Sequence, residues 1–148
     1  MSDTSPDFED VRAAATRLAG RIVHTPLLRH PLLDTLTGAT VLVKPEPLQR
    51  TGSFKERGAR NALLKLTPAA RRRGVVAASA GNHALGLAYH GKLLGIPVTV
   101  VMPDYAPLIK ITTCQRLGAN VMVHGRDFIE ARAQADALAA ERGYTYIH

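Results

Sequence analysis

The stretch GVVAASAGNHALGLAYHGKLLGIPVTVVM, residues 74–102, decides the fold because it reads as a strand, a loop, a helix and a second strand. Its apolar run at residues 75–78 predicts a short buried strand. Residues 83–94 predict a helix that ends at Gly95, and residues 97–102 predict the second strand. Two strands joined by a helix in this way form a right-handed unit in which both strands run parallel.

The same alternation continues after this unit. Helices are predicted at residues 107–117 and 127–142, and strands at residues 120–123 and 144–147. The pattern repeats at a pitch of roughly 23 residues, as in proteins that alternate strands and helices around one parallel sheet. The predicted fold class is therefore α/β, with βαβ units and a parallel sheet.

The first part of the chain is less regular. Ser5 and Pro6 predict the start of a helix, with the serine as its N-cap and the proline in its first turn. A short helix closed by Gly38 follows, and residues 39–44 predict a strand. These elements precede the regular α/β pattern.

A turn ahead of the next helix carries the most distinctive lysine. It reads LQRTGSFKERGA, residues 48–59. Gly52 lets the backbone bend sharply, and Ser53 is expected to cap the helix that runs to about Leu66. Lys55 then lies in the first turn, where the positive end of the helix dipole disfavours an ammonium and favours a neutral amine or an imine. A solvated surface lysine is the alternative interpretation.

The basic charge of the chain does not indicate a nucleic-acid partner. The formal net charge is +7, but the basic residues are scattered apart from one cluster at residues 71–73. Aromatic residues are scarce, tryptophan is absent, and no stacking platform is visible. Charge alone reports non-specific attraction, so we expect no nucleic-acid site.

Length and hydropathy indicate an ordinary cytoplasmic domain. The 148 residues are 46% hydrophobic, which suits one packed domain. No apolar run reaches the ~18 residues of a membrane span, and residues 1–4 are polar, unlike a secretion signal. The single cysteine, Cys114, cannot form an internal disulfide and is expected in the core rather than as a nucleophile. The histidines show no metal-ligand spacing, so no metal is expected.

Two motifs carry a resemblance to a known family. LQxTGSFKxRGA at residues 48–59 and SAGNHA at residues 79–84 resemble the motifs of fold-type II pyridoxal-phosphate (PLP) enzymes, whose fold is tryptophan synthase β-like. The chain resembles most the threonine and serine dehydratases, which are ammonia-lyases, from Val11 to its last residue. The resemblance implies that residues 1–70 open a larger domain and residues 71–148 form most of a smaller α/β domain. The chain thus resembles an N-terminal fragment of such an enzyme.

The resemblance implies PLP as the cofactor and gives roles to three residues. Lys55 matches the lysine that bonds PLP as a Schiff base. Phe54 matches the aromatic residue that packs against the ring of PLP, with simple core burial as the alternative. Asn82 matches the asparagine whose amide contacts the 3′-oxygen of the ring. Its alternative role is to cap the helix that follows, a common task for asparagine.

The loop that contains Asn82 is expected to bind the substrate. It joins the carboxyl end of a strand to the start of a helix, where α/β sheets bind ligands and unpaired amides face anions. The resemblance implies that this loop holds the α-carboxylate through Ser79, Ala80, Gly81, Asn82 and His83. His83 is expected to line the loop rather than act as a base, because the family assigns proton transfer to the lysine. Glu56 and Arg57 are expected to be surface charges on their helix.

The implied activity is PLP-dependent β-elimination of L-threonine or L-serine to a 2-oxo acid and ammonia, as in isoleucine biosynthesis. Ala80 stands where serine racemases carry a serine as second proton carrier, which favours elimination over racemisation. The partners implied are a small amino-acid substrate and, in the full-length form, further copies of the chain. A β-replacement enzyme of the cysteine synthase type and a non-catalytic remnant are the alternatives. The glycine run that holds the phosphate lies further downstream in the family, so residues 1–148 alone are expected to bind PLP poorly and to be inactive.

Overall fold

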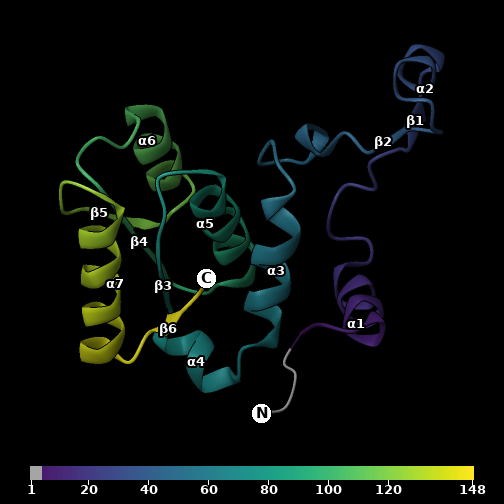
Figure 1. Ribbon diagram of the computed structural model, residues 1–148. Coiled ribbons are helices and arrows are strands. Elements are labelled where there is room, and N and C mark those ends of the chain that lie inside the picture. The colour runs from purple at the N-terminus through teal and green to yellow at the C-terminus, as the bar shows by residue number, and fades with distance from the viewer. Residues whose placement is uncertain (1–4) are drawn as a thin grey trace.

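The computed structural model describes residues 5–148, and the polar stretch at residues 1–4 lies outside the described residues. The first half contains α1 (Phe8–Leu18), β1 (Leu28–Arg29), α2 (Pro31–Thr37), β2 (Leu42–Val43), the 3-10 helix η1 (Glu46–Leu48), α3 (Lys55–Lys65) and α4 (Pro68–Arg73). The second half contains β3 (Val75–Ala78), α5 (Asn82–Leu94), β4 (Val98–Met102), α6 (Leu108–Arg116), β5 (Asn120–Val123), α7 (Phe128–Arg142) and β6 (Thr145–Tyr146). Figure 1 shows an α/β body, with α1 and the β1–α2–β2 segment on the far side of α3.

Four strands form one parallel sheet in the order β5-β4-β3-β6. Val75 of β3 lies opposite Val98 of β4 on one side and Thr145 of β6 on the other. The chain goes from β3 to β4 and β5 in one direction and then returns to add β6 beside β3. The topological switch point therefore lies between β3 and β6, which is where open α/β sheets bind their ligands. The predicted α/β fold with a parallel sheet is confirmed.

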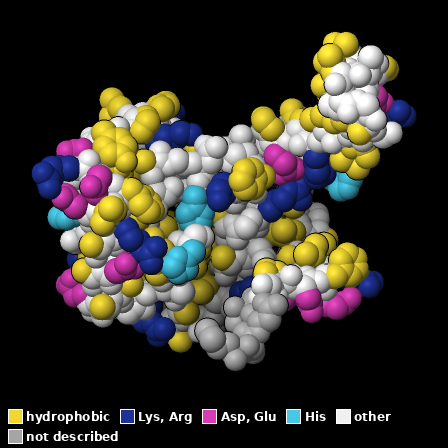
Figure 2. Space-filling model, in the orientation of Figure 1, with side chains coloured by type: hydrophobic (Ala, Val, Ile, Leu, Met, Phe, Trp, Pro, Cys, Tyr) yellow, Lys and Arg dark blue, Asp and Glu magenta, His cyan; other side chains and the backbone are white. Residues whose placement is uncertain are grey.

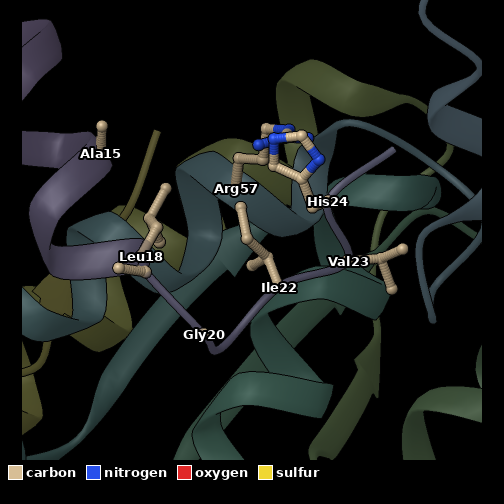
Figure 3. Close-up of a pocket in the computed structure, with 8 residues that line it drawn as sticks. Ala15, Leu18, Gly20, Ile22, Val23, His24 and Arg57 are labelled. Atoms are coloured by element: carbon tan, nitrogen blue, oxygen red, sulfur yellow. The ribbon is translucent and has the colours of Figure 1, made fainter. Parts of the chain in front are cut away.

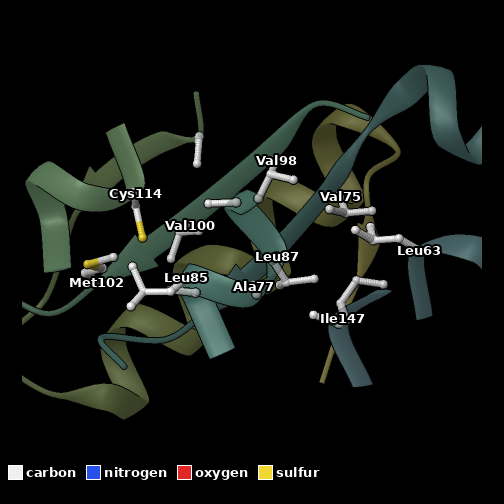
Figure 4. Close-up of a cluster of buried hydrophobic side chains, with 14 of the residues drawn as sticks. Leu63, Val75, Ala77, Leu85, Leu87, Val98, Val100, Met102, Cys114 and Ile147 are labelled. Carbon is white, nitrogen blue, oxygen red and sulfur yellow. The ribbon is translucent and has the colours of Figure 1, made fainter. Parts of the chain in front are cut away.

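Both faces of the sheet are covered by helices, because successive strand residues point to opposite sides. One face packs with α3, α5 and α6 in the main core (Figure 4), to which the strands contribute Val75, Ala77, Val98, Val100 and Met102. The other face packs on α7 through Val76, Ala78 and Val101. Burial on both sides explains why the strands read as continuous apolar runs.

Helices α3 and α5 pack closely and run in the same direction. Gly86 of α5 lies where an added Cβ would be 3.2 Å from the carbonyl oxygen of Lys55 and 3.1 Å from the Cβ of Ala59. One turn later His90 of α5 meets Arg60 of α3, at 3.2 Å. Lys55 is the first residue of α3 and Gly86 the fifth of α5, so the two helices begin near the same contact.

Residues 21–49, here called the arm, extend from the body between α1 and α3. Its β1 and β2 strands pair antiparallel, with Leu28 opposite Val43, and Figure 1 shows them with α2 at the far end of the arm. Figure 2 shows hydrophobic side chains on its surface, and the exposed ones include Leu27, Leu28, Leu32, Leu36, Leu42 and Val43. The base of the arm is fastened to α3 by polar contacts, described below.

Three expectations for the first half were wrong or incomplete. The first helix begins at Phe8 rather than at Ser5 and Pro6, because Asp7 accepts a hydrogen bond from the backbone N–H of Asp10 at 2.9 Å and forms a capping box. The strand expected at residues 39–44 shortens to Leu42–Val43, since only β1 is present to pair with it.

The third is α4, a short helix that the sequence analysis did not predict. Thr67 caps it by accepting a hydrogen bond from the N–H of Ala70 at 3.2 Å, and Pro68 occupies its first turn. A threonine followed by proline is a common helix start, so the signal was present. The helix is only six residues long, which is too short for an apolar repeat to reveal it.

Residues 5–148 contain no helix that is both long and apolar enough to cross a membrane. In the same range, no three His, Cys, Asp or Glu side chains are grouped so that they could hold a metal ion. The side chain of Cys114 is fully buried, which confirms its expected place in the core.

Candidate functional site

Lys55 is the first residue of α3 and follows a tight turn. Gly52 has a φ of +76°, which confirms the expected sharp bend at this position. Phe54 rather than Ser53 occupies the cap position, and no side chain caps the helix, so the expected role of Ser53 was wrong. Ser53 instead turns inward, and its buried hydroxyl has no hydrogen-bond partner among the described residues.

Glu56 stabilises the turn that precedes Lys55 by accepting hydrogen bonds from it. One carboxylate oxygen of Glu56 accepts hydrogen bonds from the N–H of Thr51 at 2.9 Å and from its hydroxyl at 3.3 Å. The Glu56 side chain is completely buried, so its expected place on the helix surface was wrong. Since a buried carboxylate needs partners, these hydrogen bonds fix the shape of the turn that presents Lys55.

The other oxygen of Glu56 faces a buried histidine, His90. Arg60 approaches Nδ1 of His90 at 3.2 Å, and because a guanidinium can only donate, Nδ1 is the acceptor and the ring proton lies on Nε2. Nε2 in turn lies 3.5 Å from Glu56. Burial lowers the pKa of His90 to about 4, although the Glu56 carboxylate opposes this effect. His90 is therefore neutral near pH 7, and its Nε2 atom lies near Glu56 without forming a hydrogen bond to it.

Arg57 fastens the arm to α3. Its Nε and Nη2 atoms donate to the two carboxylate oxygens of Glu46, each at 2.7 Å. The Arg57 side chain is half-buried, so this residue is a paired group rather than a free surface charge. These hydrogen bonds lower the pKa of Glu46 to about 2, so the ion pair is fully formed at neutral pH.

The loop after β3 ends at the start of α5. The N–H of Ser79 donates to the carbonyl of Val101 at 3.0 Å, and the Ser79 hydroxyl accepts from the N–H of Gly81 at 3.3 Å. Gly81 takes the cap position and Asn82 is the first helical residue, so the alternative role of Asn82 as the N-cap was wrong. With no side-chain cap, the first amides of α5 remain available to an anion.

Two side chains at this helix start are fixed by neighbouring elements. The Oδ1 atom of Asn82 accepts a hydrogen bond from Nζ of Lys110 on α6, at 2.8 Å. Nε2 of His83 lies 3.3 Å from the carbonyl oxygen of Ile147, just after β6, and donates to it because a carbonyl only accepts. Burial lowers the pKa of His83, and the ammonium of Lys55 adds to this effect.

The structure thus brings the two motifs to one end of the α3–α5 pair. The charge of Lys55 acts on His83, and the backbone of Lys55 lies against Gly86, one turn beyond Asn82. Phe54 is 60% exposed, which excludes the core-burial alternative, and its ring centre lies 5.2 Å from Nζ of Lys55. The contact of His83 with Ile147, just after β6, places the loop after β3 near the switch point of the sheet, where a ligand is expected.

These groups fit PLP chemically. Within residues 5–148 the Lys55 amine forms no ion pair with a carboxylate, so it is available to condense with an aldehyde. Phe54 offers an exposed ring face for stacking. Asn82 offers an exposed amide, and the uncapped start of α5 offers backbone donors for an anion.

An apolar hollow lies elsewhere on the chain (Figure 3). It has a volume of about 370 Å³ and lies between α1 and the start of the arm, lined by residues that include Leu18, Ile22, Val23, His24 and Arg57. None of the residues expected to bind PLP or substrate contributes to it. It is therefore separate from the end of α3 and α5 where the motifs meet.

Sequence reasoning missed Lys110, Glu56 and His90 as neighbours of the site. Lys110 follows β4, the strand beside β3, so its closeness to the loop after β3 depends on a strand order that the sequence does not give. Glu56 and His90 are 34 positions apart and meet only because α3 lies on α5. The one available signal was the glutamate next to Lys55, on the side of the helix that carries Ala59 and Leu63.

Comparisons with known proteins agree with this arrangement. The profile of the family described as "Pyridoxal-phosphate dependent enzyme" matches residues 18–148. The chain is 45% identical to an L-threonine ammonia-lyase of Thermotoga maritima over 141 residues, which are 95% of this chain and 35% of that protein. It is 45% identical over 140 residues to an L-threo-3-hydroxyaspartate ammonia-lyase of a Pseudomonas species, covering 95% of this chain and 44% of that one.

Solved structures of the same family superpose well. Maize serine racemase matches with a TM-score of 0.89 and 31% identity, over 96% of this chain and 43% of its own. Threonine deaminase isoform 2 of Solanum lycopersicum matches with a TM-score of 0.83 and 35% identity, over 98% of this chain and 41% of its own. The chain spans less than half the length of these relatives, and both likenesses confirm the fold-type II resemblance. The chain belongs to the family of pyridoxal-phosphate dependent enzymes.

Proposed function

We propose that this chain forms part of an ammonia-lyase that uses PLP to eliminate water and then ammonia from L-threonine or L-serine. The observation that supports the proposal is the packing of α3 on α5 at Lys55 and Gly86, because the backbone of Lys55 lies against the helix that begins at Asn82. Two similar proteins are named as ammonia-lyases acting on β-hydroxy amino acids, which supports this substrate class.

In this proposal Lys55 holds the cofactor and later moves a proton. Its neutral amine takes the proton from the α-carbon of the substrate, and the C–O bond to the β-hydroxyl then breaks as that proton passes to the departing oxygen, so that water leaves. Bound PLP supplies a ring that withdraws the electron pair of the broken C–H bond. The unsaturated amine released reacts with water to give ammonia and 2-oxobutanoate from threonine, or pyruvate from serine.

The remaining residues bind and orient. Phe54 packs against the ring, and the Asn82 amide donates to its 3′-oxygen. The substrate carboxylate lies at the uncapped start of α5, among Ser79, Ala80, Gly81, Asn82 and His83. His83 is fixed to Ile147 and lines this loop rather than moving a proton. Ala80 has no group that titrates, so it cannot return a proton from the opposite face, and elimination is favoured over racemisation.

The proposal extends to the cellular setting of the whole protein. We place it in the cytoplasm, because a buried, unpaired cysteine is typical of proteins that work in a reducing compartment. Threonine as substrate would place it in isoleucine biosynthesis, with further copies of the same chain as partners. Residues 1–70 then belong to a larger PLP domain and residues 71–148 to a smaller one.

Borohydride reduction of the full-length protein with PLP, followed by peptide mapping, tests the site. We expect a stable adduct on Lys55 in the wild type and no adduct in Lys55→Ala, while Lys65→Ala, at the other end of α3, is labelled as in the wild type. An adduct on any other lysine in the wild type would overturn the assignment.

Product analysis tests the reaction. L-Threonine or L-serine alone is expected to give a 2-oxo acid and ammonia in equal amounts. A β-replacement enzyme would instead form product only when sulfide and an activated serine are supplied, which would contradict the proposal. A labelled protein with neither activity would support the non-catalytic alternative.

A further inference from the structure

Lys110 reaches the site from α6, an element that neither motif contains. Its ammonium donates to Oδ1 of Asn82 at 2.8 Å. We propose that Lys110 is a positioning residue, which holds the Asn82 amide so that its NH₂ group faces the 3-oxygen of PLP. This inference rests on the function proposed above and deepens it.

The chemistry of the two side chains fixes the orientation. A lysine ammonium carries three donors and no acceptor, so the amide atom in contact with it must be the oxygen. The Nδ2 atom lies in the same plane, on the other side of the Cβ–Cγ bond, and presents two donors. A half-turn of the amide would present the oxygen to the ring oxygen instead, and two acceptors repel each other. Lys110 therefore selects the amide orientation that can bind PLP.

Lys110 is itself well held. It lies in the first turn of α6, where its N–H donates to the carbonyl of Pro107 at 2.8 Å, and its side chain is half-buried. Asn82, in contrast, has an exposed side chain in the first position of α5, and the bond to Lys110 is the one that the described residues make to its amide oxygen. The ammonium of Lys110 is thus the group among the described residues that can set the orientation of the Asn82 amide.

The strand order explains why these residues meet. β4 lies directly beside β3, so the segment after β4 comes back beside the loop after β3. Lys110 lies eight positions after Met102, the last residue of β4. Asn82 lies four positions after Ala78, the last residue of β3. Among the described residues Lys110 forms no ion pair, so nothing competes with Asn82 for its ammonium.

A double-mutant cycle in the full-length protein tests the proposal. The dissociation constant of PLP is measured by equilibrium dialysis for the wild type, Lys110→Met, Asn82→Ala and the double variant, with unfolding midpoints recorded for each. Lys110→Met keeps the apolar stem and removes the donor. We expect it to weaken PLP binding by about tenfold, the loss of one hydrogen bond. Lys92→Met, an exposed lysine near the other end of α5, is expected to bind PLP as the wild type does.

The decisive measurement is the effect of Lys110→Met on PLP binding in the Asn82→Ala variant, which lacks the amide. Because Lys110 acts through Asn82, adding Lys110→Met to Asn82→Ala is expected to weaken binding no further. Full additivity, or wild-type binding by Lys110→Met, would overturn the inference, since a merely structural lysine would act in both backgrounds. Borohydride mapping separates the two claims. If PLP is fixed on Lys55 but the two substitutions are additive, or Lys110→Met binds PLP as the wild type does, only the inference about Lys110 is wrong and the proposed function stands. If PLP is fixed on another lysine, the proposed function itself is wrong.

Discussion

Glu56 determines how Lys55 is presented although it does not face the site. Its side chain lies under the turn, accepts from both donors of Thr51, and faces His90 of α5. Removing a buried carboxylate leaves its hydrogen-bond donors without partners. The resulting loss of folding stability is larger than the net contribution of the hydrogen bonds. The residue therefore links the conformation of the lysine turn to the stability of the core.

We expect Glu56→Ala to lower the free energy of unfolding by about 2–4 kcal/mol, because it opens a cavity and orphans buried donors. Glu56→Gln is expected to cost less, since its amide oxygen can still accept from the N–H of Thr51. Urea unfolding of the full-length protein measures both. Glu141→Ala, on the exposed end of α7, is the control and should change stability by less than about 0.5 kcal/mol. Equal effects of Glu56→Ala and the control would contradict this role.

Ala80 sets the outcome of proton return at the proposed site. Replacing it by serine adds a hydroxyl to the loop after β3, at the position where the resemblance to serine racemases implies a second proton carrier. If elimination proceeds as proposed, Ala80→Ser should form about 10²-fold more D-serine from L-serine than the wild type, the usual contribution of a placed proton donor. Chiral chromatography measures this product. Retained elimination without any D-serine would show that position 80 does not face the α-carbon.

Single residues were predicted well where the chain itself dictates their state. Gly52 needs a positive φ, and Cys114 lies on the apolar side of its helix, so both predictions were correct. Glu56 and Arg57 were placed wrongly at the surface, because charged residues are usually exposed unless a distant partner pairs with them. Those partners, His90 and Glu46, come from other elements and leave no mark in the local sequence.

At the scale of elements, the packing of α3 on α5 sets the geometry near the site. It depends on Gly86, which has no side chain to separate the helices. Any group added there presses on the carbonyl of Lys55 and on Ala59 at the same time. The helix spacing and the position of the lysine are therefore set together.

Gly86→Ala is expected to destabilise the protein by about 1–3 kcal/mol, the usual cost of overpacking, and to weaken PLP binding because Lys55 is displaced. Gly58→Ala is the matched control on α3. An added Cβ there meets nothing within 4 Å, so this variant should be as stable as the wild type or up to about 1 kcal/mol more stable. Thermal unfolding compares the two. A Gly86→Ala protein as stable as Gly58→Ala would show that the helices separate at no cost.

The elements after residue 74 were predicted almost to the residue, since glycines and prolines mark their ends. The earlier elements were predicted less well. β1 and β2 have two residues each and exist only because they pair with one another, and the short α4 is stabilised by a cap rather than by an apolar repeat. Local periodicity detects long elements and misses those that depend on a partner or a single side chain.

At the scale of the whole molecule, Glu46 joins the arm to the body through the two hydrogen bonds that it accepts from Arg57 of α3. Within the arm, the same carboxylate accepts from the hydroxyl of Thr25 at 2.6 Å and from Gln49 at 3.3 Å. Gln49 also bonds both backbone groups of Val23. The attachment is therefore electrostatic and depends on the charge of one carboxylate.

This attachment should be lost in acid. The pKa of Glu46 falls from its ordinary 4.5 to about 2 because Arg57 bonds the charged form. The unfolded chain thus binds this proton at a higher pH than the folded chain, so the stabilisation is complete above pH 4.5 and is lost as the pH falls through about 2. Glu46→Gln should cost about 1–2 kcal/mol at pH 7 and nothing below pH 2.

Urea midpoints of the wild type and Glu46→Gln across this pH range measure the effect. Glu9→Gln, which removes an exposed pair with Arg12 at 3.6 Å, is the control and should differ from the wild type by less than about 0.5 kcal/mol throughout. If the difference in unfolding free energy between the wild type and Glu46→Gln persists in acid, packing rather than charge attaches the arm.

The global fold class followed from the alternation of apolar strands and helices, but the order of strands did not. Nothing in the sequence of β6 states that it joins β3 rather than β5, because this choice depends on which faces the helices cover. The two motifs predict that Lys55 and Asn82 serve one site, and this stays a prediction. The contribution of Lys110 was not, since it depends on β4 lying beside β3.

The common starting point of α3 and α5 has a kinetic consequence. Two helix dipoles present their positive ends at one corner, and the ammonium groups of Lys55 and Lys110 add to them. Anionic metabolites are drawn toward such a corner before they touch it, over a distance that shrinks to about 10 Å in 0.1 M salt. Capture of a phosphorylated vitamin or a carboxylate should therefore slow as ionic strength rises, even where the final affinity changes little.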